Sequence, residues 1–334
     1  MKAFIHSISY YLPEQKLTNQ ELIDFFPDWT VNKISEKIGI SNRYLSGKDE
    51  FASDLAVEAA EKLFDEHSID RNIIDMIILC TQSPDYFLPT TACIVQDRLR
   101  IPTTAGAFDF NLGCSGYVYG LAMAKGFIVA GISKNVLLIT SEIYSKHIHP
   151  NDKGNRTIFG DGASATLVST SGFAEIKEFS LGTDGSGAEN LIVKQGGMRF
   201  PKKSDQTFED EFSNVCWPGC LYMNGAAIFN FTLESVPLLV QNTLITNNLE
   251  KINIDWYIFH QANKFMLTHL MKKIGIEKEK FLMYMEDVGN TVSSTIPIVA
   301  KEFRDKSTFS SKQNILLAGF GVGYSWGGCV IQIV

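Results

Sequence analysis

Three residues of this sequence carry the side chains of a nucleophilic acyl-transfer site: a thiol, an imidazole and a carboxamide. Cys114 follows the turn NLG, His260 begins the segment HQAN, and Asn290 lies in GNTVSS. A thiolate attacks carbonyl carbon, an imidazole moves or donates a proton, and N–H groups stabilise a developing oxyanion. Such a set would catalyse acyl transfer if the chain folds these three distant residues together.

Cys114 lies where a strand is expected to turn into a helix. The apolar run 107–110 precedes it and suits a buried strand, and apolar residues at helical spacing follow over 118–127. Unpaired N–H groups at a helix N-terminus favour negative charge, so we expect the thiol to have a lowered pKa. Gly113 and Gly116 would leave room for a substrate carbonyl beside the backbone. A small, inert core cysteine would show the same local pattern.

Composition restricts the class of protein. The chain has 334 residues, 45% of them hydrophobic and 20% charged, as in globular proteins with a large core. No apolar run reaches the roughly 18 residues of a membrane span, and the N-terminus turns polar too early for a secretory signal. The net charge of −7 argues against a general nucleic-acid binder. Six scattered cysteines predict free thiols in a reducing cytoplasm rather than disulfides.

Patterning predicts strands and helices in alternation. The apolar runs DMIILC and NVLLITSE predict buried strands, and helices are expected at about 53–67 and 91–99. Another strand, DWYIFH, lies between two helical segments, NGAAIFNFTLESVPLLVQNTL and KFMLTHLMKKIGI. The loop before residue 91 carries Tyr86, Phe87 and Leu88, which are apolar where a solvated loop would be polar. They cover a pocket, form a subunit contact, or simply pack.

Three further motifs suggest other chemistry but fit it less well. Asp161 lies between glycines in IFGDGASATLV, where an aspartate more often holds a turn than catalyses. GFGVGYSWGG has the glycines of a dinucleotide loop, but the strand CVIQIV follows it where a helix is required. Its backbone N–H groups, with that of Cys114, suit an oxyanion hole instead. Cys216 and Cys220 have no second Cys/His pair nearby, so no metal site is expected.

The two halves of the sequence echo each other at a spacing of about 180 residues. DMIILC from Asp75 matches DWYIFH from Asp255, and NVLLI from Asn135 matches NILLA from Asn314. Between each pair a strand enters a helix through a glycine turn, in FDFNLGCSG and in YMEDVGNTVSS. The period is far too long for a solenoid, so it indicates a duplicated α/β unit packed as one body.

Duplication gives the three candidate residues a common place. Equivalent strand ends from two α/β units can meet at one crevice, with Cys114 from the first half and His260 and Asn290 from the second. Taken singly, a buried structural histidine and a turn asparagine are both common. At matched points of a duplicated unit they predict one catalytic site. Papain-like proteases also use Cys, His and Asn, but they need no duplication and are usually secreted with disulfides.

The sequence resembles the β-ketoacyl-ACP synthase III family in the order and spacing of five motifs: NLGCSGYVYGL, IFGDGASATLV, HQAN, GNTVSSTIP and GFGVGYSWGG. The resemblance covers nearly the whole chain. It implies an α/β, thiolase-like fold in which two duplicated halves, residues 1–172 and 173–334, form a five-layered α-β-α-β-α body. It also implies a homodimer and a catalytic triad of Cys114, His260 and Asn290.

The chemistry implied by this resemblance is a two-stage condensation that needs no bound cofactor or metal. Cys114 accepts an acyl group from acyl-CoA or from acyl carrier protein (ACP), while the backbone N–H groups of Cys114 and Val322 hold the oxyanion. Malonyl-ACP then loses carbon dioxide beside His260 and Asn290, which donate hydrogen bonds to its thioester oxygen. The resulting carbanion attacks the acyl-cysteine and gives a 3-oxoacyl-ACP.

The resemblance also implies binding surfaces. Lys264, Lys272 and Lys273 would form a basic patch for the acidic carrier protein. Phe87 and Leu88 would line the acyl pocket or a dimer contact. The segment 201–220 is unlike the usual loop of the family and would reshape the acyl pocket.

The sequence departs from the family pattern where coenzyme A is held. Lys33, Lys37 and Lys153 stand where the family has tryptophan, arginine and arginine, Trp29 lies upstream, and Phe265 replaces a frequent arginine. Lysine cannot replace an arginine that stacks or bonds bidentately, so a carrier-linked acyl donor stays open. The same departures motivate an alternative, a non-decarboxylating acyltransferase that acylates a hydroxyl or an amine. A non-enzymatic carrier-binding subunit is disfavoured because all three triad positions are filled.

Overall fold

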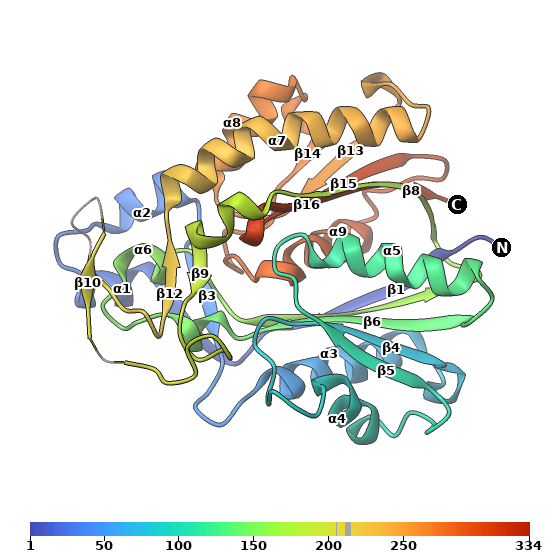
Figure 1. Ribbon diagram of the computed structural model, residues 1–334. Helices are drawn as coiled ribbons and strands as arrows, with labels where there is room; N and C mark the ends of the chain where they lie inside the picture. Colours follow the sequence, from blue (N-terminus) through green and yellow to red (C-terminus); the bar gives the residue numbers. More distant parts are fainter. Residues whose placement is uncertain (205, 211–214) are drawn as a thin grey trace.

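The chain folds into five layers, which Figure 1 shows from the side. The computed structural model describes residues 1–204, 206–210 and 215–334. One helical layer covers the strands of the first half from outside, a central helical layer separates them from the strands of the second half, and a further helical layer covers those from the other side. In this order the helices are α3 (Ala52–His67) and α4 (Thr91–Arg98), then α5 (Gly116–Val129) and α9 (Thr295–Asp305), then α7 (Gly225–Thr246) and α8 (Lys264–Ile274). The expected thiolase-like α/β class is confirmed.

Ten strands lie in the order β14-β13-β15-β16-β8-β1-β7-β6-β4-β5. The first half supplies β1 (Phe4–Tyr11), β4 (Met76–Cys80), β5 (Gly106–Phe110), β6 (Asn135–Glu142) and β7 (Gly162–Ser169). The second half supplies β8 (Ala174–Thr183), β13 (Trp256–Phe259), β14 (Phe281–Leu282), β15 (Asn314–Gly321) and β16 (Ser325–Ile333). The series β1-β7-β6-β4-β5 has the same sequence of antiparallel and parallel pairings as β8-β16-β15-β13-β14. A short pairing of β1 with β8 joins the two halves.

The duplication extends to individual hydrogen bonds. The backbone N–H of Asp75 donates to the carbonyl of Asn135 at 3.1 Å, and that of Asp255 donates to the carbonyl of Asn314 at 3.0 Å. In return the carboxylates accept from the N–H of the same asparagines, at 3.2 Å in the first half and 2.8 Å in the second. The residues matched in the sequence therefore make matched contacts. The boundary after residue 172 falls just before β8, and the division into domains stays a prediction.

The central helices are buried because both sides face a sheet. In α5 the fully buried residues are Tyr117, Val118, Leu121, Ala124 and Ile128. Outer helix α3 buries only one face, which includes the apolar residues Ala56, Ala59, Ala60, Leu63 and Phe64. Within the described ranges, no helix combines the length and the apolar character needed to cross a membrane.

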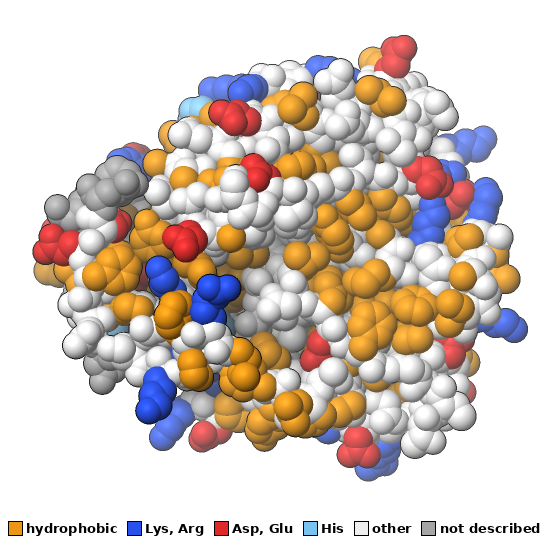
Figure 2. Space-filling view, viewed as in Figure 1, with side chains coloured by type: hydrophobic (Ala, Val, Ile, Leu, Met, Phe, Trp, Pro, Cys, Tyr) orange, Lys and Arg blue, Asp and Glu red, His pale blue; other side chains and the backbone are white. Residues whose placement is uncertain are grey.

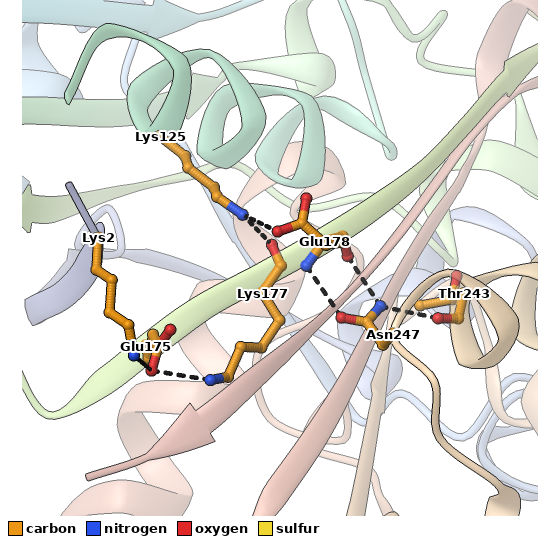
Figure 3. Close-up of polar contacts among 7 residues, drawn as sticks. All are labelled: Lys2, Lys125, Glu175, Lys177, Glu178, Thr243 and Asn247. Carbon is orange, nitrogen blue, oxygen red and sulfur yellow. Dashed lines mark hydrogen bonds and ion pairs between the residues drawn. The ribbon is translucent and has the colours of Figure 1, made fainter. Parts of the chain in front are cut away.

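Polar contacts hold β8 between a helix of the first half and a helix of the second (Figure 3). Lys125 of α5 donates to the carbonyl of Lys177 at 2.8 Å and forms an ion pair with Glu178 at 2.9 Å. Asn247, just past the end of α7, accepts from the N–H of Glu178 at 3.0 Å and donates to its carbonyl at 3.1 Å. One strand therefore fixes the central layer against the outer layer.

Shorter elements lie together at one end of the layers (Figure 1). They are β2 (Gln15–Thr18), α1 (Asn19–Phe25), α2 (Val31–Ile38), β3 (Asn42–Leu45), α6 (Lys153–Arg156), β9 (Leu191–Val193), β10 (Phe208–Glu209), β11 (Val215–Cys216) and β12 (Leu221–Met223). Thr18 caps α1, and α2 ends at a left-handed Gly39 with φ of 72°. Within segment 201–220, residues 205 and 211–214 lie outside the described residues.

The strand before Cys114 corrects one expectation. β5 forms where the apolar run predicted a strand, but all five of its residues are half-buried rather than buried. It stands at the end of the strand order and pairs with β4 alone in the described part of the chain. An apolar run predicts a buried strand only if a strand of the same chain pairs with it on each side. An apolar edge strand is instead a place where another chain can pair.

Candidate active site

Cys114, His260 and Asn290 line a single cavity of about 150 Å³. They follow β5, β13 and β14 respectively, so equivalent turns of the two halves bring them together. Their exposed fractions are 6%, 2% and 3%, so the reacting groups are nearly dry. Apolar side chains complete the walls, among them Ile158, Phe159, Leu191, Ile228 and Phe320.

The Cys114 thiol lies two residues before α5, as predicted, but its pKa moves in the unexpected direction. Burial raises the pKa of Cys114 to about 12, the backbone N–H of Val322 opposes the rise, and the Glu142 carboxylate adds to it. The prediction of a lowered pKa was therefore wrong for the free protein. Loss of hydration outweighs the favourable N–H groups because the thiol is buried among mostly apolar walls. The thiol is protonated at rest, and its proton must leave as the sulfur attacks.

Glycines around the nucleophile serve close packing. A Cβ on Gly116 would lie 2.3 Å from the Cys80 sulfur, and one on Gly113 would lie 2.7 Å from a methyl carbon of Val322. The expectation that these two glycines make room for a substrate carbonyl was wrong, because protein side chains already occupy that space. Gly321 was not among the predicted site residues, and a Cβ there would lie 2.8 Å from the Cys114 sulfur. The alternating glycines of GFGVG were its signal.

His260 ends β13 and is held in a neutral state. Burial lowers the pKa of His260 to about 3, with a small opposing effect of the Val292 carbonyl. Its Nδ1 lies 2.8 Å from the hydroxyl oxygen of Thr295, the first residue of α9. A neutral imidazole can donate from one nitrogen and accept at the other, which is what a proton-handling group in a closed cavity needs.

Asn290 is oriented by the backbone of Val292. The N–H of Val292 donates to Oδ1 of Asn290 at 2.9 Å, while Nδ2 makes a long contact of 3.4 Å with the carbonyl of Ala262. The hydrogen bond from Val292 fixes the carboxamide oxygen as an acceptor, so the Nδ2 group is the part of Asn290 that can donate to a substrate. Val292 adopts φ of 56°, an outlier for a β-branched residue that costs about 1–3 kcal/mol. The role of Val292 in orienting Asn290 was not predicted from the sequence, because the backbone N–H performs it and not the side chain.

The predicted oxyanion donor Val322 lies beside the nucleophile. It begins the short helical turn Val322–Tyr324 after β15. Its backbone N–H reaches the Cys114 sulfur, as the lowering effect on the thiol pKa shows. The turn runs directly into β16, so the Gly-rich segment is not a dinucleotide loop. The role of Val322 in holding an oxyanion stays a prediction.

A larger cavity of about 760 Å³ adjoins the first one and shares Leu191 with it. Val322, Tyr144 and Phe87 are among its lining residues. Phe87 and Leu88 are 79% and 83% exposed, so the loop that carries them stands out from the surface. Phe87 therefore lines this cavity, and the roles expected for Phe87 and Leu88 in the acyl pocket or in a dimer contact stay predictions.

A third cavity of about 600 Å³ shares Met223 and Gly225 with the catalytic one, which gives a second approach to the site. Trp29 and Lys153 line it. The ammonium of Lys153 lies 5.7 Å from the centre of the Trp29 ring, and that of Lys33 lies 5.2 Å from it. Three residues that depart from the family pattern therefore meet at this entrance.

The predicted carrier-protein residues lie on α8. Lys264 is its first residue, Lys272 and Lys273 are in its last turn, and all three are exposed. Lysines in the last turn also stabilise the helix dipole, so their position alone assigns no partner. Phe265 is 51% exposed and packs against His269 with ring centres 4.2 Å apart.

Asp161 has a structural role, as the sequence favoured. It is fully buried and accepts hydrogen bonds from the backbone N–H groups of Ser46 at 2.7 Å and Ser145 at 2.9 Å. It therefore ties two loops together and does not line the catalytic cavity.

The duplicated five-layered fold and the buried cysteine site define a condensing enzyme of the thiolase-like class. Two family descriptions match the chain: 3-oxoacyl-[acyl-carrier-protein (ACP)] synthase III over residues 108–185, and the C-terminal part of the same synthase over residues 244–333. The chain belongs to the β-ketoacyl-ACP synthase III family.

Similar proteins of known name agree with this assignment. The β-ketoacyl-ACP synthase III of Clostridium perfringens ATCC 13124 is 36% identical over 327 residues, with 97% of each chain covered. That of Streptococcus agalactiae NEM316 is 36% identical over 336 residues, with 99% of each chain covered. A crystal structure of a 3-oxoacyl-ACP synthase III is 48% identical, with a TM-score of 0.96 and full coverage of both chains. The 3-oxoacyl-ACP synthase of Burkholderia xenovorans LB400 is 35% identical, with a TM-score of 0.89 and coverage of 100% and 94%.

Proposed function

We propose that this protein catalyses the reaction for which its relatives are named, the synthesis of a 3-oxoacyl-ACP. An acyl group moves from a thioester to Cys114, and malonyl-ACP then condenses with it and loses carbon dioxide. The observation that carries this proposal is the single cavity shared by Cys114, His260 and Asn290. Larger cavities on two sides of it supply room for an acyl chain and for an incoming thioester arm.

The first stage is acylation of Cys114. Its sulfur attacks the thioester carbonyl and loses its proton, and the N–H groups of Cys114 and Val322 stabilise the oxyanion. The proton passes to the departing thiolate, which leaves as a free thiol. The raised pKa of the buried thiol supports an attack coupled to proton loss rather than a resting thiolate.

The second stage is condensation. His260 and Asn290 donate to the thioester oxygen of malonyl-ACP, and this stabilises the enolate that forms as carbon dioxide leaves. The enolate carbon attacks the acyl-cysteine carbonyl, and Cys114 departs and recovers a proton from solvent. The neutral state of His260 and the fixed amide of Asn290 support these donor roles.

We infer that the working enzyme is a homodimer. The open apolar edge of β5 supports pairing with a second copy. Figure 2 shows hydrophobic side chains gathered on the face where Figure 1 places α5, β5 and β6. The exposed Phe87 and Leu88 would find cover in such a dimer. Cys80, Cys93, Cys114, Cys220 and Cys329 are present as free thiols, which fits a cytoplasmic setting.

The partner that delivers malonyl groups is expected to be an acidic carrier protein. The exposed Lys264, Lys272 and Lys273 on α8 supply a positive surface for it. Neither a bound cofactor nor a metal enters the proposed reaction.

The test is intact-protein mass after incubation with acyl-CoA and acyl-ACP thioesters, followed by malonyl-ACP. We expect an acyl mass increment that is absent in Cys114→Ala and that malonyl-ACP removes with release of carbon dioxide. His260→Ala should keep the increment and lose that release. An acyl label that malonyl-ACP leaves in place, but that a hydroxyl or amine acceptor removes, would instead establish the non-decarboxylating acyltransferase.

A further inference from the structure

The Nδ1 nitrogen of His260 has a partner that the reaction scheme has not used. The hydroxyl oxygen of Thr295 lies 2.8 Å from this nitrogen, and the same hydroxyl is placed to donate to the carbonyl oxygen of Val292 at 3.0 Å. Thr295 is 3% exposed, so solvent does not compete for either contact. A hydroxyl has one proton, which Thr295 can give to only one of these two neighbours at a time.

The Val292 carbonyl does not depend on the hydroxyl. It already accepts the backbone N–H of Thr295 at the start of α9. The left-handed backbone of Val292 holds this carbonyl where both Thr295 and the imidazole of His260 reach it. The hydroxyl proton of Thr295 is therefore free to serve Nδ1 without leaving a buried carbonyl unsatisfied.

The direction of this hydrogen bond decides which nitrogen of a neutral His260 carries the proton. If Thr295 donates to Nδ1, the imidazole proton is on Nε2 and His260 can donate a hydrogen bond into the cavity. If the hydroxyl is removed, the Val292 carbonyl still reaches the imidazole of His260, and a carbonyl only accepts. The imidazole proton would then be held on Nδ1, and Nε2 would present a lone pair instead of a donor.

We propose that Thr295 is a positioning residue that holds the proton of His260 on Nε2 for the decarboxylation of malonyl-ACP. This inference rests on the proposed function. Stabilising the enolate needs a donor at Nε2, whereas acylation of Cys114 relies on the backbone N–H groups of Cys114 and Val322. Loss of the Thr295 hydroxyl should therefore affect the second stage of the reaction and spare the first.

The experiment compares Thr295→Val with Thr295→Ser and uses Thr291→Val as the matched control. Valine keeps the shape of threonine, and serine keeps the hydroxyl. Thr291 is also fully buried, and its hydroxyl oxygen has no hydrogen-bond partner among the described residues. The rates of Cys114 acylation and of carbon dioxide release from malonyl-ACP are measured separately for each variant.

Thr295→Val should lower carbon dioxide release by about 100- to 1,000-fold, the range for loss of one oxyanion donor, and leave acylation within about threefold. Thr295→Ser and Thr291→Val should keep both rates within about threefold of the wild type. Equal losses of both rates in Thr295→Val, or no loss in either, would overturn the proposal. Failure of the wild type to acylate would instead refute the proposed function.

The tautomer itself gives a second readout that needs no catalysis. Nitrogen-15 NMR of histidine-labelled protein distinguishes a protonated ring nitrogen from a bare one. We expect the wild type to carry the His260 proton on Nε2 and Thr295→Val to carry it on Nδ1. A wild-type proton on Nδ1 would overturn the proposal, even if Thr295→Val did not fold.

Discussion

Gly321 lies directly against Cys114, and a Cβ placed on it would stand 2.8 Å from both Cβ and the sulfur of the nucleophile. The same strand approaches again at Gly319, where a Cβ would lie 2.7 Å from the carbonyl oxygen of Cys114. β15 of the second half therefore packs directly against the nucleophile, which belongs to the first half. The position of the sulfur depends on the absence of side chains at these two places.

Gly321→Ala should displace the thiol and slow acylation of Cys114 by at least about 100-fold, since a shift of about 1 Å in a reacting group has that effect. The new methyl group meets the sulfur and Cβ of Cys114 rather than the end of a flexible chain, so relief requires movement of the nucleophile. The measurement is the rate of acyl-enzyme formation by intact mass. A rate within threefold of the wild type would show that the sulfur tolerates this displacement.

Gly126→Ala is the matched control and carries a prediction of its own. Gly126 lies inside α5, and a Cβ there would meet nothing within 4 Å. Alanine removes the entropic cost of glycine in a helix, so we expect the free energy of unfolding to rise by about 0.5–1 kcal/mol with activity unchanged. Urea unfolding measures the change. A drop in stability would mean that α5 is distorted or covered at this point.

The fold was predictable because its signal is repeated. Asp75 and Asp255 begin matched strands in the sequence, and they make matched hydrogen bonds in the structure. In a duplicated α/β unit the ends of equivalent strands meet at one crevice. The sequence alone therefore predicted that Cys114, His260 and Asn290 lie in one site. Local patterning also located α3, which was expected at about residues 53–67, and β4 through its apolar run.

What the sequence could not predict depends on neighbours distant in the chain. The helix start at α5 favours a Cys114 thiolate, but burial raises the pKa of this thiol. Residues of the second half of the chain contribute to that burial. The apolar run of β5 cannot show that the strand stands at a sheet edge. Val292 contributes its backbone rather than its side chain, so no residue type marks its role in orienting Asn290.

Glu142 should influence the reactivity of Cys114 only when it is ionised. It is fully buried and accepts from the N–H of Gln82 at 3.1 Å, and burial raises its pKa to about 8. Its negative charge is one cause of the raised pKa of Cys114. Glu142→Gln should therefore speed alkylation of Cys114 by about three- to tenfold at pH 9.5, and leave it unchanged at pH 6.5, where the wild-type carboxyl is neutral.

The Glu142 measurement follows iodoacetamide labelling of the Cys114 peptide by mass spectrometry, because five other thiols are present. Cys114→Ala supplies the background. The same rate ratio at both pH values would show that the substitution acts through packing and not through charge.

His260 should make the protein less stable in acid, and the sign follows from its lowered pKa. The folded protein holds His260 with a pKa of about 3, against an ordinary value of 6.5. Between these values the unfolded chain binds a proton that the folded chain does not, so stability falls as pH drops below 6.5. From pH 7 to pH 5 this loss is about 2 kcal/mol.

His260→Asn removes the titrating group. Between pH 7 and pH 5 its free energy of unfolding should therefore fall by about 2 kcal/mol less than that of the wild type. Other buried histidines such as His147 titrate in both proteins and cancel in the difference. Urea unfolding at pH 7 and pH 5 gives the comparison, and parallel pH dependence of the two proteins would mean that His260 takes up its proton without unfolding.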